Sequence, residues 1–166
     1  MIFGSLKEGP TKAMYRRKNK VLMLANVGMI PKLPWFSYSA DGFAIVDGEL
    51  VLVEVKVLKI GRKFVGLEFL ERVPFLFLNE NNEWEMRRNH EYYGQIQFGL
   101  FTFNLKKAKL LLYVHKNKTV EVVDVHINVP FLNDYVLTLT KVYFQFFLPF
   151  LCANAKDLGI NSESKS

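Results

Sequence analysis

The sequence predicts an α/β (α+β) fold, with a central mixed β-sheet flanked by helices. Two pairs of strand-like runs predict the sheet, because each pair is joined by a tight turn, one at Asp47-Gly48 and the other at residues 116–118. Residues 89–104 predict a helix, since their apolar side chains recur at helical spacing. A further long amphipathic helix is expected from Pro130 to Cys152. The predicted order is α-β-β-(α)-α-β-β-α.

The first half of the chain supplies a helix and a hairpin. Residues 5–18 read as a short helix that ends in the basic run YRRKNK. The segment MIPKLPWFSYSADG (29–42) is predicted to be a loop by its Pro, Ser and Gly content. The runs 43–46 and 49–60 then form the first hairpin.

The second half begins with a segment that is hard to assign. Residues 64–73 are compatible with a helix, and NENNEW (79–84) predicts a turn. The helix within 89–104 carries its apolar stripe at Tyr92, Ile96, Leu100 and Phe103. Residues 109–115 and 119–127 make the second hairpin.

Length and composition indicate one folded domain. We expect residues 1–158 to form it, short at its N-terminus, and 159–166 to be a disordered tail. A hydrophobic content of 50% excludes a disordered chain. The net charge of +6 and the pI near 9.4 favour a polyanionic partner, nucleic acid first and an acidic membrane surface second. Many basic proteins have neither partner, so charge alone leaves this open.

Cysteine usage and hydropathy bear on the compartment. The lone Cys152 has no internal disulfide partner, and no Cys/His cluster has zinc spacing, so we expect an intracellular, reducing compartment, cytoplasm or nucleus. The start MIFGSLKEGP lacks the apolar core of a signal peptide. The apolar run 142–153 is interrupted by Gln145 and Pro149 and is shorter than the roughly 20 residues that span a bilayer, so it predicts a buried helix and no membrane partner.

Two opposite charges lie inside the apolar run ELVLVEVKVL. Side chains on a strand alternate between faces, so Glu54 and Lys56 share a face that is otherwise apolar. Buried charge is costly unless it is paired or bound to a metal. One interpretation is an edge strand that carries an ordinary, solvated ion pair.

The alternative interpretation is a metal site. Asp41 comes just before the preceding strand, so the hairpin can bring its carboxylate near Glu54. Two carboxylates and a backbone carbonyl form a hard, all-oxygen site suited to Mg²⁺ or Mn²⁺. A neighbouring lysine can stabilise negative charge on a phosphate or position the attacking water. This order of acid, then acid-x-lysine, is the PD-(D/E)XK nuclease constellation, although the spacing alone often arises by chance.

Further segments resemble the phage lambda exonuclease family, also called YqaJ-type viral recombinases. PWFSYSADGF (34–43) is similar to the family's PWLGASPDG, with Ala40 in place of the usual proline. VLVEVK (51–56) matches its E-x-K strand, and HEYYGQIQFGLF (90–101) resembles its YYxQxQ helix. The ending, a strand pair and then a helix containing FFLP, also fits. These four matches are collinear and cover nearly the whole chain.

The resemblance implies a restriction-endonuclease-like core and a metal-dependent DNA exonuclease. In it, Asp41, Glu54 and the backbone carbonyl of Val55 would hold Mg²⁺ or Mn²⁺, and Lys56 and Gln95 would manage the water and the scissile phosphate. It further implies digestion of linear duplex DNA from a 5′ end, in recombination or DNA-end processing. A ring-shaped homotrimer and a single-strand annealing protein as partner are also implied.

A third acid belongs to the family's first helix. Gly4, Glu8 and Tyr15 have the family's spacing, which makes Glu8 the candidate. The surrounding EGPTKAMY departs from the family pattern at Pro10 and Thr11. Glu8 is equally explained as a first-turn acid favoured by the helix dipole.

The remaining candidates concern the glutamines, the tyrosines and the basic residues. Gln95 and Gln97 cannot both face the site because they lie about 200° apart on a helix, and Gln97 is expected to be a surface or packing residue. Tyr92 is a candidate for DNA contact, with core packing as the alternative. The candidate phosphate contacts are Arg16, Arg17 and Lys18, which would otherwise form a solvated face.

Two other function classes remain open from the sequence. One is a catalytically inactive or fragmentary nucleic-acid-binding module on the same fold. The other is an interaction domain in which the acidic cluster is a plain ion-pair network. The dispersed His90, His115 and His126 are expected to be structural.

Overall fold

The computed structural model describes residues 2–25, 29–33, 35–155 and 157. The predicted disordered tail, 159–166, lies outside the described residues. The contacts divide the chain into two units, Met1–Asn128 and Val129–Ser166. The expectation of a single domain over 1–158 stays a prediction.

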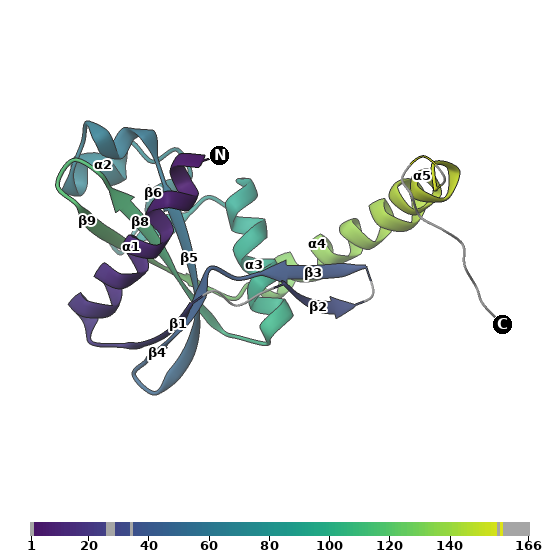
Figure 1. Cartoon of the computed structure of the whole chain (residues 1–166), viewed down its shortest axis with the longest axis horizontal. Coiled ribbons are helices and arrows are strands. Elements are labelled where there is room, and N and C mark those ends of the chain that lie inside the picture. Colours follow the sequence, from purple (N-terminus) through teal and green to yellow (C-terminus); the bar gives the residue numbers. More distant parts are fainter. Residues whose placement is uncertain (1, 26–28, 34, 156, 158–166) are drawn as a thin grey trace. The chain divides into compact units, whose positions relative to one another are not determined.

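The first unit is built on a five-stranded sheet with the order β1-β4-β5-β8-β9 (Figure 1). Its strands are β1 (Leu22–Ala25), β4 (Gly42–Val46), β5 (Glu49–Val57), β8 (Lys107–Val114) and β9 (Thr119–His126). β5 and β8 pair in parallel, and the other neighbours pair antiparallel. The predicted mixed sheet with helices beside it is therefore confirmed, and both predicted hairpins, β4–β5 and β8–β9, are present.

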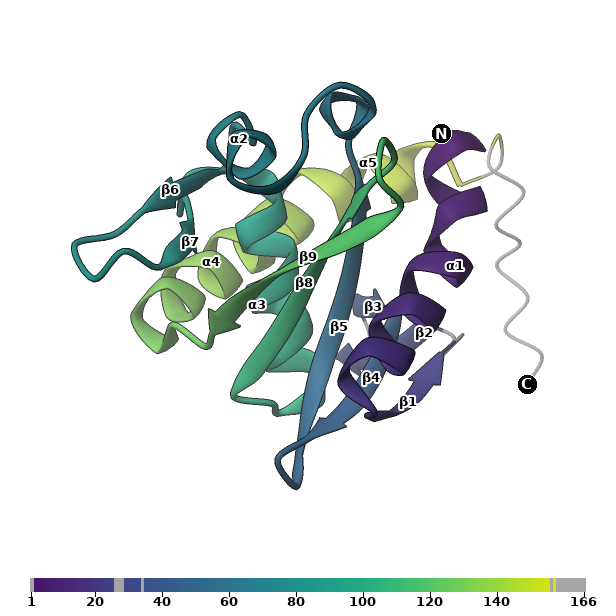
Figure 2. The ribbon, with the colours of Figure 1, turned by 90° about the vertical axis from the view of Figure 1, so that its left-hand side faces the viewer.

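Two helices lie on opposite sides of this sheet, α1 (Ile2–Asn19) and α3 (Glu91–Phe103) (Figure 2). On the α1 side, Tyr15 packs in a buried cluster with Val51, Val53 and Val55. On the α3 side, Leu52 lies against Gly99. The predicted alternation of β5 is confirmed. Because both faces of β5 are covered, its sequence is an almost continuous apolar run.

The predicted loop at 29–42 is wrong for most of its length. Two strands, β2 (Met29–Leu33) and β3 (Phe36–Ser39), form a separate antiparallel pair. In β3, buried Phe36 and Tyr38 alternate with exposed Ser37 and Ser39, which is the period of a half-buried strand. The Pro and Ser content of the segment obscured this pattern. β1 was also not predicted.

The connection from β5 to α3 contains four short elements, namely η1 (Lys59–Arg62), α2 (Gly66–Glu71), β6 (Leu76–Leu78) and β7 (Trp84–Met86). The turn predicted at 79–84 joins β6 to β7, as expected. The Asp47-Gly48 turn has positive φ at both residues, 51° and 79°, which is the backbone of a tight hairpin turn.

The second unit contains α4 (Val129–Val142), a π-helical turn (Tyr143–Phe147) and α5 (Leu148–Ala153). They join into one helix from Val129 to Ala153, which by length and composition alone is apolar enough to cross a membrane. The helix was predicted, but the expectation that residues 142–153 are buried is wrong, because Phe146, Phe147 and Phe150 are more than half exposed. Pro149 does not end the helix; it lies two residues after the π-helical turn, where the regular α-helical hydrogen-bond pattern is already interrupted.

Candidate active site

The register of β4 and β5 brings the two predicted acids together. At the end of the hairpin away from the turn, the last paired residues are Gly42 and Val53. Continuing the same register would pair Asp41 with Glu54. At this position the Asp41 side chain takes the place of a backbone acceptor, because its Oδ2 accepts a hydrogen bond from the Val55 N–H at 2.7 Å. Asp41 therefore ends the hairpin with its carboxylate beside β5.

Glu54 is a buried acid, with 1% of its surface exposed. The Tyr38 hydroxyl donates a hydrogen bond to its Oε1, and the Lys56 ammonium lies 3.9 Å from its Oε2. Burial raises the pKa of Glu54 to about 8, and the nearby negative charge of Asp41 adds to the rise. The Tyr38 hydrogen bond and the Lys56 charge act on this pKa in the opposite direction, but they do not cancel it.

Lys56 is held by groups from α3. Its ammonium donates to Gln95 Oε1 at 3.0 Å. It also lies 4.5 Å from the centre of the Tyr92 ring, within the range of a cation–π contact. The structure thus brings Asp41, Glu54, Lys56 and Gln95 together, and it places Tyr92 against Lys56. The fixed ammonium is suited to binding an anionic group.

Two residues at this site were missed from the sequence, Lys12 and Tyr38. Lys12 is buried on α1, and its ammonium donates to the backbone carbonyl of Asp41 at 2.8 Å. One sequence signal existed, because Lys12 follows Glu8 by one helical turn and so shares its face of α1. For Tyr38 the signal was the strand alternation of β3, hidden by the predicted loop.

The other predicted residues lie on α1. Glu8 is partly exposed, and Arg16, Arg17 and Lys18 are exposed at the C-terminal end of the helix. Within the described residues no group of three or more His, Cys, Asp or Glu side chains is arranged to hold a metal ion. The structure therefore does not join Glu8 to Asp41 and Glu54, and its role as a third acid stays a prediction.

Gln97 is a packing residue, as expected. It is fully buried, its Nε2 donates to the His126 carbonyl at 2.7 Å, and its Oε1 accepts from the Asn128 N–H at 2.8 Å. His90 caps the start of α3 by accepting from the Tyr92 N–H through Nδ1. Gln97 thus ties α3 to the end of β9, whereas His90 stabilises the start of α3 itself.

The donor set fits a small divalent cation. Asp41 and Glu54 offer carboxylate oxygens, which are the hard ligands that Mg²⁺ and Mn²⁺ prefer. Burial, and then the nearby charge of Asp41, raise the pKa of Glu54, which records the cost of ionising this acid beside a second one. A cation between them would remove it.

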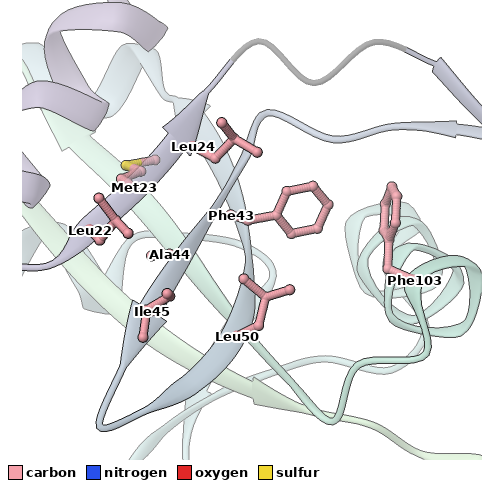
Figure 3. Close-up of a pocket in the computed structure, with 8 residues that line it drawn as sticks. All are labelled: Leu22, Met23, Leu24, Phe43, Ala44, Ile45, Leu50 and Phe103. Atoms are coloured by element: carbon pink, nitrogen blue, oxygen red, sulfur yellow. The ribbon is translucent and has the colours of Figure 1, made fainter.

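A separate apolar pocket lies on the same sheet. Its volume is about 630 Å³, and it is lined by Leu22, Met23, Leu24, Phe43, Ala44, Ile45, Leu50 and Phe103 (Figure 3). The rings of Phe43 and Phe103 meet edge to face there, with centroids 4.7 Å apart. None of the four clustered site residues lines this pocket, and its lining carries no charged side chain, so it is unsuited to a phosphate.

The fold is shared with a solved nuclease. An alkaline exonuclease from Laribacter hongkongensis (LHK-Exo), solved in complex with dAMP, superposes with a TM-score of 0.69 at 14% identity, covering 97% of this chain and 75% of that chain. A second structure of LHK-Exo gives a TM-score of 0.61 at 13% identity, with the same coverage. No protein-family model and no curated protein sequence matches the chain. At this identity the likeness concerns the fold.

Proposed function

We propose that the chain is a metal-dependent DNA exonuclease of the lambda exonuclease/YqaJ type, which hydrolyses phosphodiester bonds at the ends of linear duplex DNA. The observation that carries the proposal is the convergence of Asp41, Glu54, Lys56 and Gln95 at one end of the β4–β5 hairpin. The fold shared with an alkaline exonuclease supports it.

In this proposal Asp41, Glu54 and the Val55 carbonyl hold Mg²⁺ or Mn²⁺. When bound, the cation would polarise the scissile phosphate and lower the pKa of a coordinated water. Lys56, held by Gln95 Oε1 at 3.0 Å, would stabilise negative charge that develops on the phosphate. Gln95 fixes the ammonium and would offer its amide N–H₂ to the water or to a phosphate oxygen.

DNA binding would rest on the basic end of α1. Arg16, Arg17 and Lys18 are exposed there and would contact backbone phosphates, with little dependence on base sequence. We also propose, from the family resemblance, a single-strand annealing protein as a partner, a homotrimeric assembly and a reducing intracellular compartment.

The test is digestion of linear 5′-phosphorylated duplex DNA in Mg²⁺ by the full chain. Loss of DNA that disappears with EDTA and in Glu54→Gln is the expected result. Glu49→Gln is the matched control, because Glu49 lies on the same strand but is exposed and pairs with Lys107. This variant should retain the activity.

Intact DNA together with a salt-sensitive complex would refute the exonuclease and support the inactive DNA-binding module. If the chain neither digests DNA nor forms a complex with it, the interaction domain becomes the better interpretation. Equal loss of activity in Glu49→Gln and Glu54→Gln would show that Glu54 has no special role.

A further inference from the structure

Tyr38 is aimed at one oxygen of Glu54. The tyrosine is buried on β3, with 6% of its surface exposed, and its hydroxyl donates to Glu54 Oε1 across 16 residues of sequence. Its ring packs edge to face on Phe103, with centroids 5.9 Å apart, and lies 6.4 Å from the ring of Phe98. Because α3 fixes the ring, the hydroxyl is fixed too.

In each of the two acids, Asp41 and Glu54, one carboxylate oxygen accepts a hydrogen bond that fixes the side chain. Asp41 Oδ2 accepts from the Val55 N–H at 2.7 Å, and Glu54 Oε1 accepts from Tyr38. The other oxygen of Glu54, Oε2, is the one that faces the Lys56 ammonium, 3.9 Å away. The carboxylate of Glu54 is thus held in one rotational position, with Oε2 turned toward the basic residue.

Gly99 on α3 makes room for this contact. A Cβ at position 99 would lie 2.6 Å from Tyr38 Cζ, the atom that carries the hydroxyl, and 2.7 Å from Leu52 Cδ2. Real Cβ atoms do not approach this closely, so a side chain at 99 would push the hydroxyl end of the ring. The close approach of α3 to β3 and β5 therefore depends on Gly99.

Position 38 is one of the places where this segment differs from the one it resembles. In the segment PWFSYSADG, Tyr38 stands where the similar segment PWLGASPDG has alanine. An alanine side chain is too short to reach a carboxylate on the neighbouring element.

We propose that Tyr38 is a positioning residue, which holds Glu54 by Oε1 so that Oε2 is directed to a divalent cation. The inference rests on the proposed function, because it concerns the same metal site. Groups that orient a metal ligand from behind commonly contribute about 10- to 100-fold to metal affinity. Removing the Tyr38 hydroxyl should therefore weaken cation binding, although Tyr38 itself is not a ligand.

The test measures Mn²⁺ affinity by calorimetric titration of the full chain without DNA. Tyr38→Phe keeps the packed ring and removes only the hydroxyl, and it should weaken Mn²⁺ binding by about tenfold or more. Gly99→Ala keeps the hydroxyl but displaces the ring, and it should also weaken binding. The matched control is Tyr93→Phe, a buried tyrosine whose hydroxyl instead accepts from Asn128 Nδ2 at 3.0 Å, and its affinity should equal that of the wild type.

The outcomes separate this inference from the proposed function. Wild-type affinity in Tyr38→Phe would overturn the positioning role while leaving the nuclease proposal intact. Tighter binding in Tyr38→Phe would also overturn it, because Tyr38 would then compete with the cation for Glu54. If the wild type binds no Mn²⁺, both proposals fall. An equal loss in Tyr93→Phe would show a general effect of losing a buried hydroxyl and would overturn the specific role.

Discussion

Replacing Glu54 by glutamine should make the metal-free protein more stable at high pH than the wild type. Glutamine has nearly the same shape, carries no charge and can still accept a hydrogen bond from Tyr38. In the folded protein burial and Asp41 raise the pKa of Glu54 to about 8, whereas its ordinary value is 4.5. The variant therefore removes an acid whose ionisation opposes folding.

The sign and size follow from proton linkage. Below pH 4.5 the Glu54 carboxyl is protonated in both states, so it adds no pH dependence. Between pH 4.5 and about 8 the folded state binds more protons at Glu54 than the unfolded state, so wild-type stability falls as the pH rises. At about 1.36 kcal/mol per pH unit, the full loss approaches roughly 5 kcal/mol, a large part of a typical folding free energy.

The assay is urea unfolding in EDTA, followed by tryptophan fluorescence, for both proteins between about pH 5 and about pH 8. The quantity of interest is the difference in unfolding free energy between the two proteins, because titrating groups that do not interact with Glu54 cancel. This difference should grow in favour of Glu54→Gln by several kcal/mol with rising pH. A difference that does not change with pH would refute the reasoning, since Glu54 would then not be a buried, proton-retaining acid.

Glu49→Gln provides a control with the opposite sign. A hydrogen bond from Lys107, together with its charge, lowers the pKa of Glu49 below its usual value. Glu49 therefore contributes stability at neutral pH, which is lost as the pH falls through its folded pKa. The variant should lose stability at neutral pH relative to the wild type, and the loss should disappear in acid.

Three further predictions follow from the same geometry. Mn²⁺ should raise the melting temperature of the wild type but not of Glu54→Gln, because a ligand that binds only the folded state stabilises that state by mass action. The stabilisation is about 2.7 kcal/mol at a ligand concentration of 100 times Kd. An equal rise in both proteins would contradict a site at Glu54. Lys56→Met should lower the rate of DNA hydrolysis by about 10²–10³-fold, as is typical for loss of one charge-stabilising group. The Mn²⁺-induced rise in melting temperature should persist in this variant. Undiminished hydrolysis would show that Lys56 has no part in the mechanism. Gln97→Leu should destabilise the fold by about 2–4 kcal/mol in urea unfolding, because it removes both hydrogen bonds of a fully buried amide, the one to the His126 carbonyl and the one from the Asn128 N–H, and wild-type stability would contradict that role.

Much of the fold was predictable because the pattern of each element is local. The period of two in residues 49–57 and the Asp47-Gly48 turn are enough to define β4 and β5, and the stripe through Ile96 and Leu100 defines α3. The β2–β3 pair was missed because Pro and Ser dominate the segment, and its alternation extends over only four residues in β3. The exposure of the helix at Val129–Ala153 was missed because an apolar sequence does not say what covers it.

The predictable part of the site is likewise the part fixed by strand register. Asp41, Glu54 and Lys56 lie on one hairpin, so their proximity follows from the turn and the strand period. Lys12 reaches the backbone carbonyl of Asp41 from α1, and Tyr38 reaches the Glu54 carboxylate from β3; only the packing of those elements on the sheet brings them there. Tertiary contacts of this kind leave little trace in one sequence.

The geometry also distinguishes between the two interpretations of Glu54 and Lys56. In a plain ion pair the lysine would lower the pKa of the glutamate, and the two charged groups would be each other's nearest partners. Instead, the Lys56 ammonium is 3.0 Å from Gln95 Oε1 and 3.9 Å from Glu54 Oε2, and burial with Asp41 outweighs its charge, so that the pKa of Glu54 rises. A second acid placed beside a buried acid adds repulsion that Lys56 does not offset. A cation between the two carboxylates would offset it, which favours the metal site over the ion pair.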